Sequence, residues 1–274
     1  MKERVIVAAI FVPLLFIVVF FLPSYALTAV VAIICAISAY ELQHSLGAKN
    51  NERIGLYVVF AAVIIPIGTH FDAGAQVFTA VILVLMSLVF AEAIIAFGTI
   101  RKVAFGQLLI ALFGGAVIPY MLSGLIGLMN MPEGRLFVLL PVISAFATDG
   151  GAYFTGVKFG KHKAFPQISP KKTVEGCLGG LAIGTATVLI YGIIIYFATL
   201  YEVKFWALII YGIMGAVFTE LGDLAFSIVK REYKIKDYGR LLPGHGGMLD
   251  RFDSMVFAAP AMYLMVTAFP AIIT

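Results

Sequence analysis

Long apolar blocks alternate with short polar segments along the whole chain. A transmembrane helix needs about 20 mostly apolar residues, and blocks of about that length recur throughout the sequence. On this basis we predict about nine spans, at residues 5–22, 25–46, 54–69, 76–97, 103–129, 135–157, 174–199, 205–229 and 248–273. The pattern therefore predicts the all-α fold of a polytopic membrane protein.

The amino-acid composition also indicates a membrane protein rather than a soluble one. Hydrophobic residues make up 62% of the chain and charged residues only 12%, and the mean hydropathy is +1.03. A soluble domain carries about 25% charged residues, so this chain could not cover a water-facing surface. The two cysteines, Cys35 and Cys177, lie in apolar stretches. Buried free thiols are a better interpretation there than a disulfide or a metal site.

The start of the chain also has features of a secretory signal peptide. Lys2 and Arg4 precede the first apolar block, and Ser24-Tyr25-Ala26 offers small residues for cleavage. Because the apolar sequence continues directly after these residues, we expect the first span to be retained.

The basic residues fall almost entirely on one side of the predicted membrane. Alternating the nine spans places 17 of the 19 Lys and Arg residues on that side and leaves only Arg135 and Lys204 on the other. The positive-inside rule then predicts a cytoplasmic N-terminus and an outside C-terminus, in the inner (plasma) membrane of the cell.

Polar residues divide the chain into two parts. In residues 1–130, which we interpret as N-terminal membrane helices, Glu41 and Glu92 are the acids within apolar sequence. Each lies near a predicted cytoplasmic helix end, so we interpret both as interfacial or helix-paired carboxylates. In residues 131–274 polar clusters accumulate on the cytoplasmic side, which indicates catalytic membrane helices with cytoplasmic loops.

The first cluster surrounds Asp149 in the sixth predicted span. An ionisable side chain within a span is costly and commonly marks a functional site. Gly150 and Gly151 follow it and allow another backbone to approach closely. A structural Asp bonded to a neighbouring helix is the alternative.

The second cluster is Ser169-Pro170-Lys171-Lys172-Thr173. Ser before Pro is typical of a helix N-cap followed by the first helical position, so we predict that the seventh span begins here. Its N–H groups, together with Lys171 and Lys172, would form a phosphate-binding arrangement. Ordinary positive-inside lysines beside a helix cap are the alternative. Gly176, Gly180 and Gly184 recur every four residues and predict close helix packing.

The third cluster is the densest in acids. Helix spacing places Glu220, Asp223 and Ser227 on one face of the eighth span, and Asp250 and Asp253 share a face if the ninth helix has begun. Carboxylates gathered at one membrane depth repel each other unless cations neutralise them. Hard divalent cations with oxygen ligands are suited to this, and Mg²⁺ commonly combines one or two carboxylates with substrate phosphates.

Basic residues and a glycine-rich loop accompany these acids. Lys230 and Arg231 follow the eighth span, and His245 lies between glycines shortly before Asp250. Cations beside acids indicate a metal and polyphosphate site. A lone histidine can equally be structural, and both interpretations of His245 remain open.

These residues resemble the signature of the phosphatidate cytidylyltransferases, also called CDP-diacylglycerol synthases. The resemblance lies in Ser227-Ile228-Val229-Lys230-Arg231, then Lys236-Asp237, then Pro243-Gly244-His245-Gly246-Gly247-Met248-Leu249-Asp250-Arg251-Phe252-Asp253. The segments 149–156 and 169–176 also resemble family segments and lie in the expected order. Motif-level resemblance covers roughly residues 140–260, whereas the N-terminal spans match in hydropathy alone.

The resemblance implies a Mg²⁺-dependent reaction of CTP with phosphatidic acid that gives CDP-diacylglycerol and pyrophosphate, with a second cation as an option. It also implies an all-helical membrane fold, the lipid bilayer as environment and a homodimer, with no nucleic acid as partner. The implied metal-binding residues are Asp223 and Asp250, joined by Asp253. The implied catalytic residues are Asp223, Asp250, Lys230, Arg231 and His245. The implied substrate-binding residues are Ser169, Lys171, Lys172, Asp149 and Arg251.

Two other functions are compatible with a polytopic chain of this kind. A related cytidylyltransferase would act on another lipid phosphate, such as an ether lipid. An ion-coupled transporter would use Asp149, Asp223 and Asp250 as an ion path, but the outer halves of these spans carry few polar residues. A CDP-alcohol phosphotransferase is disfavoured because its Asp-Gly-x-x-Ala-Arg string does not occur here.

Overall fold

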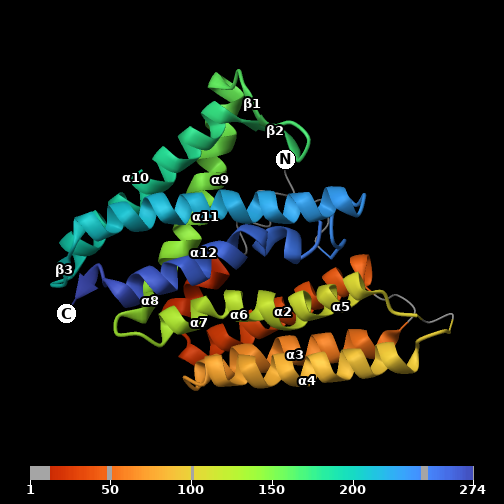
Figure 1. The fold of residues 1–274 in the computed structure, drawn as a ribbon. Coiled ribbons are helices and arrows are strands. Elements are labelled where there is room, and N and C mark those ends of the chain that lie inside the picture. Colours follow the sequence, from red (N-terminus) through yellow and green to blue (C-terminus); the bar gives the residue numbers. More distant parts are fainter. Residues whose placement is uncertain (1–12, 48–50, 100–101, 242–245, 274) are drawn as a thin grey trace. The chain divides into compact units, whose positions relative to one another are not determined.

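The computed structural model describes residues 13–47, 51–99, 102–241 and 246–273. Helices dominate this part of the chain, and the all-α prediction is confirmed (Figure 1). The chain forms two compact units. Unit 1 comprises residues 1–130 and 235–252, and unit 2 comprises residues 131–234 and 253–274. The sequence-based division at residue 130 stays a prediction.

Unit 1 contains most of the N-terminal spans. Helices α2 (Ser24–Leu46), α3 (Glu52–His70) and α4 (Gly74–Ile95) follow one another along the chain. The next span is built in pieces: α5 (Phe105–Leu112), the π-helix η1 (Phe113–Val117), α6 (Ile118–Leu122) and α7 (Gly124–Met129). Two glycines in η1, Gly114 and Gly115, lie against side chains of α2 and α4 and against the backbone of α3, and they let these helices approach closely.

Unit 2 holds long helices, one small β-hairpin and a second pair of short strands. Its elements are α8 (Gly134–Phe137), α9 (Leu139–Phe159), β1 (Lys163–Phe165), β2 (Ser169–Thr173), α10 (Val174–Ala198), β3 (Glu202–Val203), α11 (Phe205–Glu232), most of α12 (Leu249–Ala268) and β4 (Ile272–Ile273). Strands β1 and β2 pair in antiparallel fashion, with Lys163 opposite Thr173. Strands β3 and β4 pair likewise, with Val203 opposite Ile272.

The glycine stripe of α10 packs closely against another helix, as predicted, and the structure identifies that helix as α9. A Cβ atom added at Gly180 would lie 2.8 Å from the Thr148 carbonyl oxygen, and one added at Gly176 would lie 2.9 Å from the Ala152 carbonyl oxygen. Larger side chains would therefore force these two helices apart. The stripe brings the N-terminal end of α10 against the C-terminal half of α9.

Seven helices in the described residues are long and apolar enough to cross a membrane. The first predicted span, 5–22, is described from residue 13 onward, and residues 13–20 are helical. The ninth predicted span corresponds to α12, which carries Asp250, Arg251 and Asp253 in its first turns and is correspondingly less apolar. The count of nine therefore stays a prediction.

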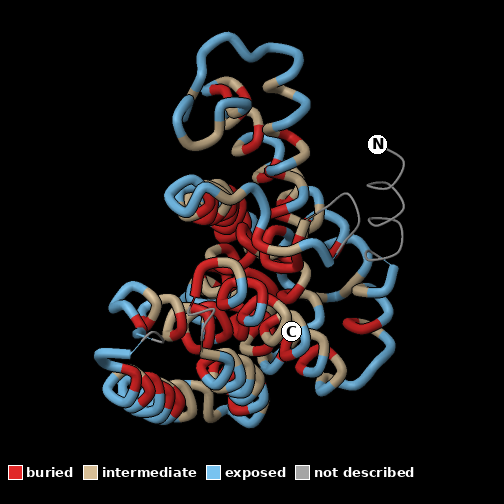
Figure 2. The backbone as a smooth tube through the Cα atoms, turned by 90° about the vertical axis from the view of Figure 1, so that its right-hand side faces the viewer, coloured by how far each residue is buried: buried red, intermediate tan, exposed pale blue. Residues whose placement is uncertain are grey.

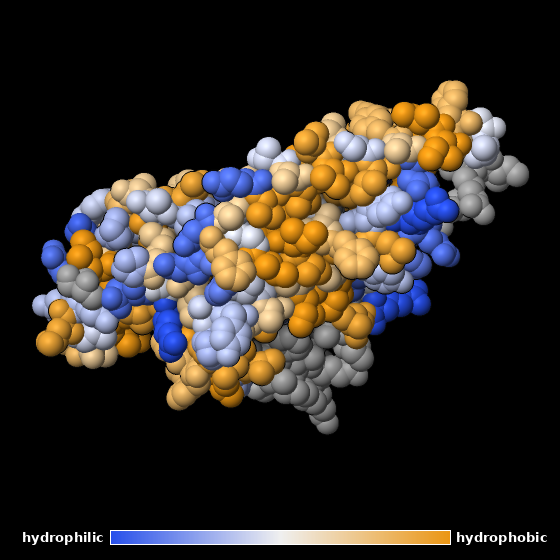
Figure 3. Space-filling model, turned by 90° about the horizontal axis from the view of Figure 1, so that it is seen from below, coloured by the Kyte–Doolittle hydropathy of each residue, from blue (hydrophilic) through white to orange (hydrophobic). Residues whose placement is uncertain are grey.

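Many large apolar side chains lie on the outside of these helices. On α10 they include Leu178, Ile190, Ile194 and Phe197, the last with 81% of its surface exposed. Figure 2 shows exposed and buried stretches alternating along the helices. Figure 3 shows apolar side chains over much of one face. Such a surface suits contact with lipid rather than water.

Candidate active site

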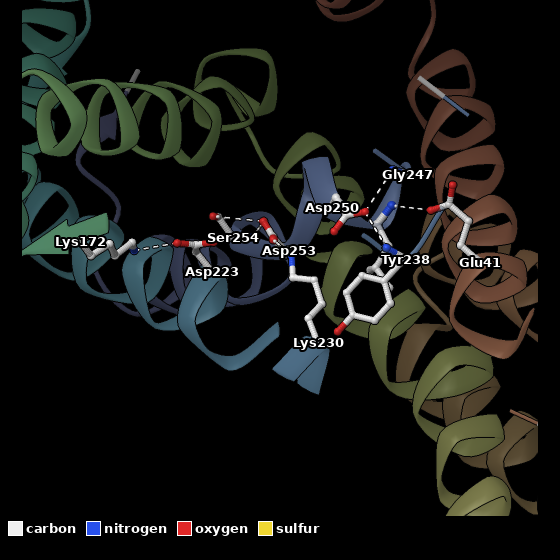
Figure 4. A network of polar contacts seen from close by, with 10 residues as sticks. Glu41, Lys172, Asp223, Lys230, Tyr238, Gly247, Asp250, Asp253 and Ser254 are labelled. Carbon is white, nitrogen blue, oxygen red and sulfur yellow. Dashed lines mark hydrogen bonds and ion pairs between the residues drawn. The ribbon is translucent and has the colours of Figure 1, made fainter. Parts of the chain in front are cut away.

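An ion pair joins the N-terminal end of α10 to α11 in unit 2. Lys172, on strand β2, places its Nζ 2.7 Å from Oδ2 of Asp223, and Figure 4 shows the two side chains pointing toward each other. The exposed fractions of the two side chains are 18% and 29%, so the pair is mostly sheltered yet open to a ligand. Both residues were predicted to belong to the site, but their pairing was not predicted.

Several carboxylates act on Lys172 together. Burial alone would lower the pKa of this lysine, but the negative charges of Asp223, Glu220 and Asp149 outweigh it, so the pKa is raised above its ordinary value. Lys172 therefore keeps its positive charge at physiological pH. The three acids come from α9 and α11 and lie near one lysine. The structure therefore brings together residues that the sequence assigned to three separate clusters.

A second ion pair lies further along α11. The Nζ of Lys230 is 3.6 Å from Oδ2 of Asp253 on α12, and the side chains are only 11% and 9% exposed. Ser254 donates its backbone N–H to Oδ1 of Asp253 at 2.8 Å. A Cβ added at Gly222 would come within 2.8 Å of the Asp253 carbonyl oxygen, so the two helices touch here. The Asp253 carboxylate therefore contacts the Lys230 ammonium group and the Ser254 backbone N–H.

The start of α10 differs from the prediction. Ser169 is not an N-cap, because residues 169–173 form strand β2 and the helix begins four residues later than expected. Pro170, which lacks an N–H, is tolerated in a two-stranded hairpin, and Thr173 is the actual cap. Its Oγ1 accepts the Gly176 N–H at 3.1 Å.

The N–H groups that open α10 are largely engaged within the chain. Val174 donates its N–H to the His162 carbonyl oxygen at 2.9 Å. Glu175 accepts the backbone N–H of Lys161 at 3.1 Å, and its Oε1 lies 2.6 Å from Nδ1 of His162. Support for phosphate binding here consequently rests on the lysines of the hairpin rather than on the helix start.

Arg231 holds the same hairpin. Its Nε donates to the Ile168 carbonyl oxygen at 3.1 Å. The guanidinium of α11 thus ties down the turn between β1 and β2, next to Lys171 and Lys172. The contact that the structure gives Arg231 is therefore one that stabilises the hairpin. Its role at substrate phosphates stays a prediction.

In unit 1 the candidate aspartate is Asp250, in the first turn of α12. It is 6% exposed. Its Oδ2 accepts the backbone N–H of Tyr238 at 2.8 Å and that of Gly247 at 3.0 Å (Figure 4). The carboxylate therefore closes the polypeptide turn that leads into its own helix.

Glu41 is the residue that sequence reasoning undervalued. From α2 it accepts the backbone N–H groups of Met248 at 3.0 Å and Leu249 at 2.9 Å (Figure 4). The only available signal was an acid within an apolar block. Glu92, by contrast, is helix-paired as predicted: Asn51, Arg53 and Tyr57 contact its carboxylate.

The structure says little about two of the predicted site residues, His245 and Arg251. His245 lies outside the described residues, and Arg251 has an exposed side chain at the start of α12. Asp223 belongs to unit 2 and Asp250 to unit 1. The distance between these two carboxylates therefore stays a prediction.

Comparison with known proteins assigns the chain to a family. The family described as "Cytidylyltransferase family" matches residues 2–269, which is nearly the whole sequence. The chain belongs to the cytidylyltransferase family.

Three curated relatives of this chain are named phosphatidate cytidylyltransferase. That of Staphylococcus saprophyticus is 43% identical over 134 residues, covering 49% of this chain and 50% of the relative. That of Bacillus subtilis is 40% identical over 136 residues, covering 50% and 49%. That of Staphylococcus aureus is 42% identical over 138 residues, covering 49% and 50%. The chain thus matches about half the length of each relative.

The acids of this cytidylyltransferase-family chain fit Mg²⁺ by their donor chemistry. Asp223, Asp250 and Asp253 offer the carboxylate oxygens that hard cations prefer. Within the described ranges, no group of three or more His, Cys, Asp or Glu side chains is arranged to hold a metal by itself. Substrate phosphates would have to complete the coordination, which is the usual arrangement for Mg²⁺. Asp223, the most exposed of the three, is best placed to reach such a complex.

The structure separates two lysines that the sequence treats alike. Lys171 is exposed, whereas Lys172 is sheltered and pairs with Asp223. A charge-assisted contact between a lysine and a substrate phosphate contributes about 1.5–3 kcal/mol. We therefore expect Lys172→Ala to lower kcat/KM for cytidylyl transfer, the reaction that the family resemblance implies, about 10-fold to 100-fold. Lys171→Ala should have a clearly smaller effect. Steady-state kinetics of purified protein would measure both.

The matched control for this comparison is Lys163→Ala, which removes an exposed lysine from the other strand of the same hairpin. It should leave the kinetics unchanged. If kcat/KM falls equally in all three variants, Lys172 has no specific role and only adds to the positive charge of the hairpin.

Proposed function

We propose that the chain transfers the cytidylyl group of CTP to phosphatidic acid, giving CDP-diacylglycerol and pyrophosphate for phospholipid synthesis. The observation that carries this proposal is the Lys172–Asp223 pair, which lies among further acids and cations in a member of the cytidylyltransferase family. The name of these relatives, phosphatidate cytidylyltransferase, supports the same substrates.

The reaction requires two polyanions to approach each other. A phosphate oxygen of phosphatidic acid attacks the α-phosphorus of CTP, the new P–O bond forms, and the bond to the β-phosphate breaks. Because the nucleophile is already anionic, no strong general base is needed. The main obstacle is electrostatic repulsion between the substrates, and charge builds up on the departing pyrophosphate.

The cationic side chains of unit 2 suit that requirement. Lys172 stays protonated because acids surround it, and in the resting chain Asp223 is its partner. A phosphate group that enters can share the lysine with this carboxylate. Lys171 and Arg231 add positive charge beside it on the hairpin and on α11. These residues would bind and orient the phosphates rather than transfer protons.

We further propose that Mg²⁺ takes part, with Asp223, Asp250 and Asp253 as the carboxylates that would hold it. When bound, the ion would neutralise triphosphate charge and stabilise the leaving pyrophosphate. Backbone N–H groups of Tyr238 and Gly247 hold Asp250, and Lys230 pairs with Asp253. A homodimer remains a prediction from the family resemblance.

The decisive experiment is an assay of the purified full chain in detergent. With labelled CTP, phosphatidic acid and Mg²⁺, labelled CDP-diacylglycerol should form, and EDTA should stop its formation. Parallel reactions with other nucleoside triphosphates and with ether-lipid phosphates serve as controls. If CTP and phosphatidic acid give no liponucleotide while another pair reacts well, the proposal fails in favour of that pair.

We also propose that the basic ends of the helices face the cytoplasm of the cell. In unit 2, Lys158 ends α9 and Lys230 lies near the end of α11, while Lys204 precedes α11 at its other end. The hairpin β1–β2 joins α9 and α10 at the same basic end (Figure 1). The positive-inside rule places that end in the cytoplasm, at headgroup level and within reach of CTP.

Cysteine labelling checks the orientation. A cysteine introduced at Lys163 should react with an impermeant thiol reagent only from the cytoplasmic side, because the hairpin lies at the basic end. One introduced at Lys204 should react from outside. Labelling of intact and opened vesicles measures both, and the reverse pattern would refute the orientation and the access route for CTP together.

A further inference from the structure

We propose that Glu41 is a positioning residue for the reaction: it holds the start of α12 and, through it, Asp250. This inference rests on the proposed function. It concerns unit 1 alone, since Glu41, Tyr238, Gly247, Leu249 and Asp250 all belong to that unit.

The contact is a buried carboxylate on backbone donors. Glu41 lies on α2 and is 5% exposed. Its Oε1 accepts the Met248 N–H at 3.0 Å and its Oε2 accepts the Leu249 N–H at 2.9 Å. Both carboxylate oxygens are therefore used, one on each of two successive N–H groups. Figure 4 shows the side chain reaching from α2 toward this turn.

The donors are the N–H groups at the beginning of α12, which starts at Leu249. The first N–H groups of a helix have no partner within it, and the positive end of the helix dipole attracts a negative charge. Such a position is normally occupied by the side chain of the residue just before the helix. Here a carboxylate from another helix takes that place and fixes where α12 begins.

Two glycines allow this close approach. A Cβ atom added at Gly239 or at Gly247 would overlap the carboxylate group of Glu41. Gly246 has a φ of +80°, in the left-handed region that favours glycine. The turn is therefore shaped to receive this one side chain.

The same turn supports Asp250. Gly247 donates its N–H to Oδ2 of Asp250, and it precedes the two residues that Glu41 holds. Tyr238, which is 3% exposed, donates the other N–H to that oxygen. A shift of residues 247–249 would therefore move the Asp250 carboxylate. A displacement of about 1 Å at a reacting group can cost about 100-fold in rate.

The experiment compares the wild-type full chain with Glu41→Gln, Glu41→Asp and Glu92→Gln in detergent. Gln keeps the size but turns one acceptor into a donor that faces an N–H group. Glu92 is the matched control, since it is also a buried carboxylate of unit 1 bonded to other groups. The measurements are kcat, KM for CTP, the Mg²⁺ concentration for half-maximal rate, and hydrogen exchange of a peptide covering residues 246–250.

We expect Glu41→Gln to lower kcat about 10-fold to 100-fold, the loss that follows from one missing charge-assisted contact. The half-maximal Mg²⁺ concentration should rise and exchange at 246–250 should accelerate, while KM for CTP changes little. Glu41→Asp keeps the charge and should recover part of kcat. Glu92→Gln should change thermal stability without changing the Mg²⁺ response.

A second pair of variants applies if Glu41→Gln does not fold. Gly247→Ala keeps the Glu41 charge and pushes the turn away from it, whereas Gly106→Ala adds a methyl group where the structure has open space. Only the first should lower kcat. Wild-type kcat and Mg²⁺ response in a folded Glu41→Gln protein would overturn this inference alone, as would equal effects of Glu92→Gln. A wild-type chain that makes no liponucleotide would overturn the proposed function and this inference with it.

Discussion

Asp223→Asn should lower the turnover number of the proposed CDP-diacylglycerol synthesis about 100-fold to 1000-fold, the range found when one preorganised electrostatic group is removed. The substitution keeps the size of the side chain and removes its charge. Lys172, 2.7 Å away, then loses its ion-pair partner, and the proposed Mg²⁺ loses its most accessible carboxylate. Initial rates with labelled CTP measure the effect.

The control is Asp72→Asn, in the turn between α3 and α4, where the residue has a φ of 57° that Asn also tolerates. It should retain wild-type turnover. Circular dichroism and thermal unfolding of Asp223→Asn would separate lost chemistry from lost folding. Turnover of the folded variant within a few-fold of wild type would remove Asp223 from the site.

Asp250→Asn should cause a loss of the same size, for a different structural reason. The carboxylate is buried, and a single oxygen, Oδ2, accepts both N–H groups of Tyr238 and Gly247. The amide oxygen of Asn can accept the same two hydrogen bonds, so the turn should survive while the negative charge disappears. We expect kcat to fall about 100-fold to 1000-fold with a nearly unchanged melting temperature.

Asp250→Ala is the companion to that variant, because it removes the acceptor as well as the charge. It should additionally lower the melting temperature, since two buried N–H groups lose their partner. If Asp250→Asn keeps full turnover and Asp250→Ala merely unfolds sooner, Asp250 is a structural residue. If both aspartates act on one metal, the effect of Asp223→Asn with Asp250→Asn should be well below the sum of the single effects in free energy.

The helices were predictable because their signal is long and repetitive. Apolar blocks of bilayer length occur in the sequence wherever the seven helices lie. The four-residue glycine spacing in α10 predicts close helix packing, and the structure supplies the partner, α9. The candidate site residues were chosen because charged side chains are dense in the second half of the chain and because they resemble the family signature. Their individual roles stay predictions. Both kinds of inference use neighbours in sequence, where helix geometry alone decides which side chains share a face.

The pairings were not predictable on the same basis. Ser169-Pro170 is typical of a helix start, yet pairing with β1 keeps the segment extended and moves the cap to Thr173. Nothing local indicates that Lys172 selects Asp223 or that Lys230 selects Asp253, since tertiary packing determines both. Glu41 is the extreme case, because its two partners are backbone groups that have no sequence signature.

The bond between Glu41 and Leu249 also constrains the order in which the protein can be completed. The two residues are 208 positions apart, so during synthesis the carboxylate is made long before its donors. At translation rates of about 5–20 residues per second, that interval is about 10–40 s. Throughout that interval the Glu41 carboxylate lacks those N–H groups, so water, a proton or a transient neighbour must satisfy its charge. The beginning of α12 is consequently a late step of maturation, and a ribosome that stalls before Leu249 leaves a nascent chain in which α2 cannot reach its final environment.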